Sequence, residues 1–319
     1  MLSLREFAKI AKVSRTTVSN AFKKNSNISD ATRARLLRLA KEYDFRPSPV
    51  MRPAARFGLT QSVGVLYPGF AASYFDDIRQ GMQVFLLERG FLPITLAVRP
   101  DTLRHALNRL VDHRIDGLAV ASWEGGGLTD EDKERLQKLA LPLVALGPPF
   151  PPGFPLTDNV GTDDVQGGRL AAQHLLQLGH RRVAALSITA DVRVRAETFR
   201  NEIERGGGCI QEPPPSEQTE YGQLHALFDT ASETERPTAV FANTDISAAR
   251  VYQVASELGL HIPADLSVIG YANLDFARIL PPPLTTICQD GRAVGAKAGE
   301  YIVERIEGCR EEPRQYLVP

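Results

Sequence analysis

Beyond residue 60, the chain alternates short apolar runs with longer segments that have a helical period. The apolar runs fall at 62–67, 93–98, 117–121, 143–146, 183–187, 239–242 and 267–271. The helical segments fall at 75–89, 103–113, 131–138, 166–177, 195–204, 224–232, 246–258 and 291–307. Such alternation predicts parallel sheets with helices on both faces. Because the Pro-rich segment 147–155 divides the pattern, we predict a bilobed α/β body that binds ligands at the carboxyl ends of its strands. The Gly/Pro-rich stretch 206–215 is expected to be surface.

The first 45 residues show helical period only, in three short segments. Ser3 with Glu6 forms a capping-box pattern, Ser14 begins the second helix, and Ser29 or Asp30 begins the third. The apolar positions expected to face inward are Leu4, Phe7, Ala8 and Ala11, then Val18 and Ala21, then Leu36, Leu37, Leu39 and Ala40. Two short helices joined by a tight turn and braced by a third are the pattern of a helix-turn-helix unit.

The second helix of such a unit presents its N-terminal side chains to base edges in the major groove of DNA. Arg15 can donate to guanine, Asn20 can pair with adenine, and Thr16 can contact a thymine methyl group or a phosphate. Other residues would bind the backbone without reading sequence. These are Ser14, Thr17, Ser19, Lys23, Lys24, Arg33 and Arg35.

Charge is divided unevenly along the chain. The formal net charge is −1, but residues 1–60 hold 13 Lys and Arg against 4 Asp and Glu, a net of +9. The remaining residues hold 24 against 34, a net of −10. A basic head on an acidic body indicates a polyanionic partner for the head alone, with a solvated basic face as the alternative.

Composition and motifs exclude several other classes of protein. With 319 residues, 43% hydrophobic and 24% charged, the chain has room for two or three soluble domains. No apolar run approaches the roughly 20 residues that span a membrane, and the charged N-terminus argues against a secretory signal. Three distant cysteines, with no phosphate loop, metal-ligand spacing or Ser/His/Asp set, predict no enzyme, metal or cofactor. We expect a cytoplasmic, nucleoid-associated protein with no membrane partner.

The run LREFAKIAKVSRTTVSNAF at residues 4–22 carries spaced Ala, Ala, Val-Ser and Thr-Val-Ser positions. In these it resembles the N-terminal domain of the lactose-repressor (LacI/GalR) family, except that Lys12 replaces the usual turn glycine. Three blocks of the body, at 174–186, 240–277 and 282–295, resemble the same family. The resemblance implies an all-α helix-turn-helix head and a type I periplasmic-binding-protein-like body with two parallel-sheet subdomains.

The resemblance also implies how the chain is divided. The DNA-binding domain would occupy 1–45, a hinge 46–60, and the ligand-binding and dimerisation domain 61–319. Within this last domain, the first subdomain would comprise about 61–158 plus 290–319, and the second about 159–289. The chain is expected to cross between the lobes near 158–162, near 286–290, and once more close to the C-terminus.

The hinge departs from the family's usual sequence. Such hinges become helical on DNA, and a leucine from each of two subunits wedges into the minor groove. Here Ala54 or Ala55 takes the place of that leucine, and Pro53 falls inside the expected helix, where a proline costs ~3 kcal/mol. Either another side chain wedges, or the hinge is an extended tether that bends the operator less, which a circular-permutation gel would measure. The hinge residues are Pro49, Val50, Met51, Arg52 and Ala54, with Met51, Val50 or Phe57 as substitute wedges.

The resemblance also implies effector-binding positions between the lobes. They are Tyr74, Phe75, Trp123, Asp163, Arg195, Thr244, Asp245, Asn273 and Gln289. The first two aromatic side chains would stack on a ligand ring or belong to the core. Arg195 would clamp the ligand, or pair with Asp163 or Glu197. Asp245 would contact the ligand or cap its helix.

Ala272 lies where relatives often carry an acidic residue that holds ligand hydroxyls. Its absence favours a less hydroxylated or anionic ligand held through Arg195, or the loss of small-molecule control.

Together these features predict a sequence-specific transcriptional regulator of LacI/GalR type, a ligand-responsive repressor. It would bind pseudopalindromic operator DNA as a homodimer, since one head makes few base contacts. A small effector, whether a sugar, a nucleobase or a small anion, would change the angle between the lobes. The alternative is a cytoplasmic solute-binding sensor without direct operator control.

Overall fold

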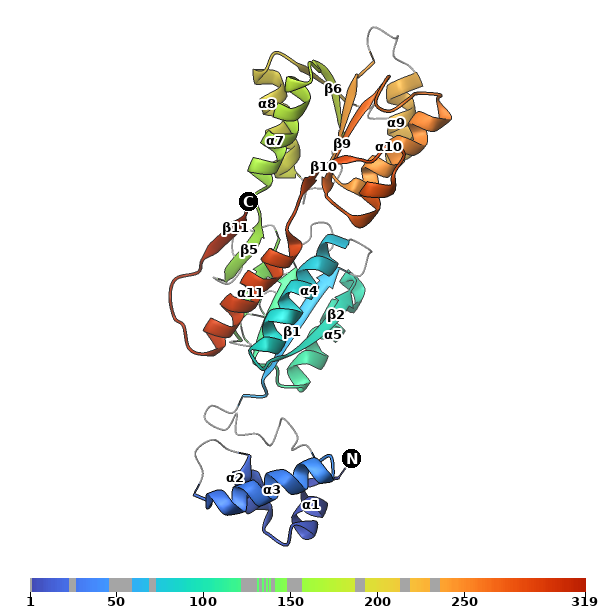
Figure 1. Ribbon diagram of the computed structural model, residues 1–319. Helices are drawn as coiled ribbons and strands as arrows, with labels where there is room; N and C mark the ends of the chain where they lie inside the picture. The colour runs from blue at the N-terminus through green and yellow to red at the C-terminus, as the bar shows by residue number, and fades with distance from the viewer. Residues whose placement is uncertain are drawn as a thin grey trace.

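A computed structural model describes residues 2–22, 27–45, 59–68, 73–121, 131, 134, 136, 138, 141–147, 157–186, 193–212, 219–229 and 236–319. It shows a helical head followed by two α/β lobes (Figure 1). The predicted hinge residues 49–52 and 54, together with Lys23, Lys24 and Trp123, lie outside the described residues. The expected bend and wedge of the hinge therefore remain predictions.

The head consists of α1 (Leu4–Ile10), α2 (Arg15–Ala21) and α3 (Asp30–Glu42). Phe7, Val18 and Leu36 are fully buried where the three helices meet. Phe45, just after α3, stacks on Phe7 with ring centroids 4.0 Å apart. Leu37 was expected to face inward but is 44% exposed, because its neighbour Leu36 takes the buried position on the helix.

The first lobe is built on a six-stranded parallel sheet in the order β11-β5-β4-β3-β1-β2. Its strands are β1 (Ser62–Pro68), β2 (Leu92–Val98), β3 (Gly117–Ala121), β4 (Leu143–Leu146), β5 (Asp158–Thr162) and β11 (Gln315–Val318). Its helices include α4 (Ser73–Glu88), α5 (Pro100–Asp112) and α11 (Gly291–Ile306), and the described residues of 131–138 are helical. Helices α4 and α11 pack very closely, since a Cβ at Gly295 would lie 1.9 Å from the Ile78 carbonyl oxygen.

The second lobe is built on a five-stranded parallel sheet in the order β10-β9-β8-β6-β7. Its elements are α7 (Asp164–Gln177), β6 (Arg182–Leu186), α8 (Arg193–Arg205), β7 (Cys209–Gln211), α9 (Glu220–Asp229), β8 (Ala239–Ala242), α10 (Asp245–Glu257), β9 (Ser267–Ala272), the 3-10 helix η4 (Asp275–Ile279) and β10 (Thr285–Cys288). Alternate residues of β6 enter different cores, with Val183 on one face and Ala184 on the other. Helices α7 and α8 lie on one side of the sheet and α9 and α10 on the other (Figure 1).

The structure corrects several expectations about this body. The stretch 206–215 contains the edge strand β7, and the expected crossings near 158–162 and 286–290 are largely the strands β5 and β10. Because β5 belongs to the first sheet, the chain enters the second lobe after residue 162, one strand later than the expected division. The third crossing is not found, since β11 pairs with β5 and residues 291–319 stay with the first lobe. These short strands lack the apolar runs that signalled the others.

Candidate functional site: the head and the lobe interface

Local side-chain caps begin each helix of the head. Ser3 and Glu6 form the predicted capping box, with the Ser3 amide donating to the Glu6 carboxylate at 2.7 Å. Ser14 Oγ accepts from the Thr17 amide at 3.0 Å, and Ser29 accepts from the amide of Thr32. The cap at Ser14 fixes the start of α2, the helix that carries the predicted base readers.

The predicted base readers lie on one side of α2. Arg15 and Thr16 are exposed, and Ser19 and Asn20 are half-buried, while the intervening Val18 is fully buried. Residues one turn apart share a helix face, so these four side chains are grouped away from the core. Such a grouping suits the reading of adjacent base edges.

The residues predicted to contact phosphates have different environments in the structure. Ser14 and Thr17 hold their hydroxyl oxygens 2.8 Å apart within the α2 cap. Arg33 is half-buried on α3. Arg35, also expected to bind phosphate, is exposed, and its Nη2 donates to the Ala11 carbonyl oxygen at 3.3 Å and so joins α3 to the end of α1.

The turn between α1 and α2 has a Schellman geometry. The Val13 amide donates to the Ala8 carbonyl and the Lys12 amide to the Lys9 carbonyl, at 3.1 and 3.2 Å. Lys12 lies between the C-cap residue Ala11 and Val13, and its φ is 52°. Glycine adopts this left-handed conformation freely, whereas another residue there costs on the order of 1 kcal/mol.

At the lobe interface, Arg195 is held from three sides. Its side chain is 9% exposed at the start of α8, with Nη2 3.0 Å from Asp164 Oδ1 and Nη1 donating to the Asn243 carbonyl at 3.0 Å. Its guanidinium carbon lies 3.8 Å from the ring centroid of Tyr271, whose hydroxyl donates to Asp164 at 2.9 Å. We call Asp164, Arg195, Asn243, Tyr271 and the first-lobe Tyr74 the interlobe polar cluster.

The acidic partner of Arg195 is neither residue that the sequence suggested. Asp163 accepts from the Gln166 amide at 2.8 Å and caps α7, and Glu197 lies 3.9 Å from Arg193. Asp164 makes the pair because it is the first residue of α7 and faces α8. Gly167 permits this arrangement, since a Cβ there would lie 2.1 Å from the Tyr271 hydroxyl.

Asp245 does not cap its helix and is hydrogen-bonded within the fold. Thr244 caps α10 through the Ser247 amide, while Asp245 is fully buried and accepts from the Leu274 amide at 2.7 Å and from the Thr286 hydroxyl at 2.5 Å. Burial raises the pKa of Asp245, and these hydrogen bonds oppose that rise. The carboxylate therefore joins the ends of β8, β9 and β10.

The remaining predicted effector positions surround the junction between the lobes. Tyr74 and Phe75 form a tilted pair 5.5 Å apart that packs on the first-lobe core. Burial raises the pKa of Tyr74 to about 12, and the charges of Asp164 and Arg195 act on it in opposite directions. Asn273 has a φ of 57° and donates Nδ2 to Cys288 Sγ at 3.6 Å. Gln289 directly follows β10 and donates at 2.8 Å to Thr162 Oγ1 at the end of β5, so it links the two lobes.

Asn243 is the residue that sequence reasoning missed. It directly follows β8 and is 4% exposed, yet neither its Oδ1 nor its Nδ2 has a hydrogen-bond partner in the described structure. The Arg195 Nε is likewise buried without a partner. Unsatisfied buried polar atoms are rare. Others lie elsewhere in the described structure, for example on Asn108, but Arg195 and Asn243 are in direct contact with each other through the Asn243 carbonyl. The signal available in the sequence was the position of Asn243 directly before Thr244 and Asp245, at the carboxyl end of a strand.

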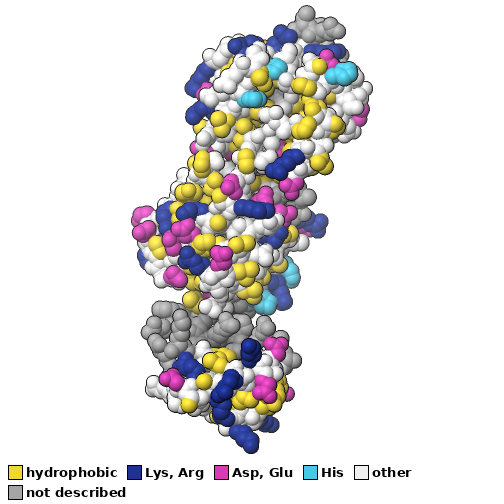
Figure 2. Space-filling view, viewed as in Figure 1, with side chains coloured by type: hydrophobic (Ala, Val, Ile, Leu, Met, Phe, Trp, Pro, Cys, Tyr) yellow, Lys and Arg dark blue, Asp and Glu magenta, His cyan; other side chains and the backbone are white. Residues whose placement is uncertain are grey.

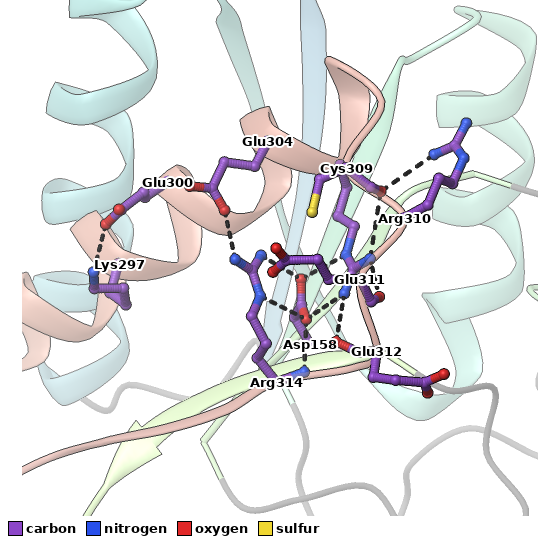
Figure 3. Close-up of polar contacts among 10 residues, drawn as sticks. Asp158, Lys297, Glu300, Glu304, Cys309, Arg310, Glu311, Glu312 and Arg314 are labelled. Carbon is purple, nitrogen blue, oxygen red and sulfur yellow. Dashed lines mark hydrogen bonds and ion pairs between the residues drawn. The ribbon is translucent and has the colours of Figure 1, made fainter.

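A second polar cluster holds the last strand on the first lobe (Figure 3). The fully buried Asp158 carboxylate receives Arg305 Nη2 at 2.8 Å and Arg314 Nη2 at 3.0 Å. Burial alone would raise the pKa of Asp158, but these hydrogen bonds outweigh burial and lower it to about 2. Arg314 also pairs with Glu304 at 2.6 Å and covers the Tyr301 ring. These contacts join β5, α11 and the segment before β11.

Among the described residues, no group of His, Cys, Asp and Glu side chains has the arrangement of a metal site. Within that same part of the chain, no helix is long and apolar enough to cross a membrane.

The chain is similar to known proteins over nearly its whole length. Residues 3–48 match the bacterial regulatory proteins of the lacI family, and residues 172–319 match a periplasmic binding protein-like domain. The HTH-type transcriptional repressor PurR of Aliivibrio fischeri (strain MJ11) is 30% identical, over 99% of this chain and 95% of that protein. The ribose operon repressor of Escherichia coli (strain K12) is 29% identical, over 100% of this chain and 98% of that protein.

Solved structures have the same architecture. The lac repressor dimer bound to operator and the anti-inducer ONPF superposes with a TM-score of 0.81 at 23% identity, covering 99% of this chain and 96% of that one. A LacI family regulator from Enterococcus faecium with bound ribose is 28% identical with a TM-score of 0.67, covering 81% of this chain and 95% of that one. The head, the two parallel sheets and the identity to these repressors lead to one conclusion: the chain belongs to the lacI family of bacterial regulatory proteins and is a DNA-binding transcriptional regulator.

Proposed function

We propose that this regulator is a repressor whose head binds operator DNA and whose interlobe polar cluster binds a small effector. The observation that carries the effector site is the pair of buried, unpartnered polar groups, Arg195 Nε and the Asn243 amide. Burying a polar group without a partner costs roughly 1–3 kcal/mol, and a ligand that supplies the missing partners recovers that cost. A protein that needed these residues only for packing would gain from apolar side chains there.

The charges at the cluster favour a neutral effector. Asp164 already balances the charge of Arg195 at 3.0 Å, and the Asp245 carboxylate is occupied by Thr286 and Leu274. The open positions are an acceptor and donors on Asn243 and a donor on Arg195, whose charge also acts on the buried Tyr74. We therefore propose a sugar or a nucleobase rather than a small anion, which would compete with Asp164. Ribose and cellobiose are bound in two similar regulators.

We propose that the regulator acts as a homodimer in which the first lobe supplies one contact surface. Val84 and Leu87 on α4 and Leu92 on β2 are 58%, 52% and 58% exposed. Val84 and Phe85 also line a groove with Ala296 of α11. Exposed apolar side chains gathered on one face mark contact surfaces, and a second copy would bury these while placing two heads on one operator.

The division of labour follows from this arrangement. Residues 1–45 would bind DNA, residues 46–60 would connect the head to the body, and residues 61–319 would bind the effector and form the dimer. We assign no catalytic role to any of these segments. An effector that binds one interlobe angle more tightly than another would shift the spacing of the two heads. Binding to chromosomal DNA would place the protein at the nucleoid.

Two measurements test the proposal. Duplexes selected from a random pool by the full-length protein should share a pseudopalindrome and shift at nanomolar concentration in a gel. Titration calorimetry with ribose, cellobiose, hypoxanthine and acetate should give heat with a sugar or a nucleobase, and Asn243→Ala should abolish that heat while the gel shift persists. Binding to no duplex would reject the repressor in favour of a solute-binding sensor, and binding of acetate alone would reject the neutral effector.

A further inference from the structure

The turn that joins α1 to α2 forms part of a basic groove in the head. The groove has a volume of about 460 Å³ and is lined by Arg5, Ala8, Lys9, Lys12, Val13, Ser14 and Arg15. Four of these residues are cationic, all four are exposed, and none of the seven is acidic. Lys and Arg side chains gather on the head in the view of Figure 2. We call this feature the turn groove.

Within the described part of the chain, the side chains of the four turn-groove cations make no hydrogen bond or ion pair, and Lys9 has only a longer-range charge interaction with Glu6. The carboxylate nearest in sequence, Glu6, is held at the start of α1 by the Ser3 amide and hydroxyl, each at 2.7 Å. The cation-rich α3 behaves differently, since Arg35 donates to a backbone carbonyl. Four cations around one groove, with Glu6 already hydrogen-bonded to Ser3, repel one another and favour a bound polyanion.

Lys12 is the most informative of the four. Its φ of 52° is the left-handed conformation that the Schellman turn requires, and this conformation favours glycine. A lysine is therefore present at a position where the backbone conformation disfavours any side chain. Backbone strain of this kind is found where a side chain serves a function. The Lys12 side chain is exposed and lines the groove, so it contributes little to packing. Its positive charge is therefore the property that accounts for a lysine at this strained position.

We propose that the turn groove binds a backbone phosphate of DNA and that Lys12 contributes its ammonium group to that contact. The inference rests on the proposed operator binding of the head and extends it to α1 and the turn. In a helix-turn-helix unit, the first helix crosses the DNA backbone while the second enters the major groove. The groove starts at the base reader Arg15 and runs along α1 to Arg5, which follows that path. Its contacts would add affinity without sequence preference.

The experiment uses two substitutions that remove the same charge with opposite effects on the backbone. Lys12→Ala removes the ammonium and keeps the strain, whereas Lys12→Gly removes the ammonium and relieves it. The full-length variants are titrated between about 50 and 200 mM salt against a duplex selected by the unmodified protein and against a mixed-sequence duplex. Both variants should bind each duplex roughly tenfold more weakly per head at 0.1 M salt, with a slope of log affinity against log salt shallower by about 0.9 per head.

Hydrogen exchange of head peptides in the full-length variants separates charge from folding. Exchange in the Lys12→Gly head should be about fivefold slower than in the Lys12→Ala head, because relief of strain stabilises the turn. Lys12→Arg should restore the salt slope, and Lys41→Ala on α3, whose lysine is exposed outside the groove, should leave it unchanged.

Two results would overturn the proposal: an unchanged salt slope in both variants, or DNA affinities that differ between the variants in proportion to their exchange. Failure of the unmodified protein to bind either duplex would instead reject operator binding itself, so the two failures are distinguishable.

Discussion

The buried pair of Asp164 and Arg195 allows a quantitative test of the interlobe polar cluster. Asp164→Asn keeps the shape of the side chain but removes its charge, leaving a guanidinium that is 9% exposed without an ionic partner. Loss of one member of a buried pair costs about 3–5 kcal/mol. The remaining contacts of Arg195 with the Asn243 carbonyl and the Tyr271 ring reduce this, so we expect a loss of about 2–3 kcal/mol.

Thermal unfolding of the full-length variant measures this loss. For a body of this size, 2–3 kcal/mol corresponds to a melting temperature lower by roughly 4–12 °C. Asp101→Asn is the matched control, because the pair of Asp101 with Arg99 is 71% and 70% exposed and should contribute nothing measurable. In the double variant Asp164→Asn with Arg195→Met, most of the stability should return, since no unpaired charge remains. An unchanged melting temperature for Asp164→Asn would refute the assignment of a buried ion pair.

Three further outcomes are expected. Asp158 has its pKa lowered to about 2 by Arg305 and Arg314, so it stabilises the fold above its unfolded pKa near 4. This contribution, about 2 kcal/mol, should disappear as the pH falls from 4 to 2, and Asp158→Asn should flatten the stability profile measured by denaturant titration across that window. Arg15→Ala should cost ~1–3 kcal/mol of operator affinity and relax one base position in a selection experiment, whereas equal weakening on all sequences would contradict base reading. Leu36→Ala, at a fully buried position, should destabilise the head by about 2–5 kcal/mol and remove the gel shift while calorimetric effector binding persists.

Much of the fold could be predicted from the sequence because most elements carry their own local signal. The strands β3, β4 and β8 are apolar runs of buried residues, and their predicted bounds agree with those in the structure. The three helices of the head have serine caps and inward-facing apolar positions that a short segment can specify alone. The strands β5, β7, β10 and β11 were not predicted as strands, since each is short and partly polar and is stabilised by its neighbour in the sheet.

The candidate site divides in the same way. The positions of Arg195 and Tyr74 could be assigned along the chain, because the resemblance to lacI-family sequences implies a role for them at the starts of their helices. Their partners could not be assigned, since a hydrogen bond joins residues that the sequence separates. Asp164 rather than Asp163 meets Arg195 because of the rotation of α7 about its axis, and Thr286 meets Asp245 across three strands.

The sequence by itself determined that this is a two-part protein with a basic helix-turn-helix head and a bilobed acidic body, because charge and periodicity are local properties of the chain. Only the tertiary structure decided which buried polar groups satisfy one another and which are left open at the lobe interface. The Asp245 carboxylate is used within the fold, and the Asn243 amide is not. That difference depends on which atoms the packing of strands and helices brings within hydrogen-bonding distance, and it is what makes the interface a candidate effector site.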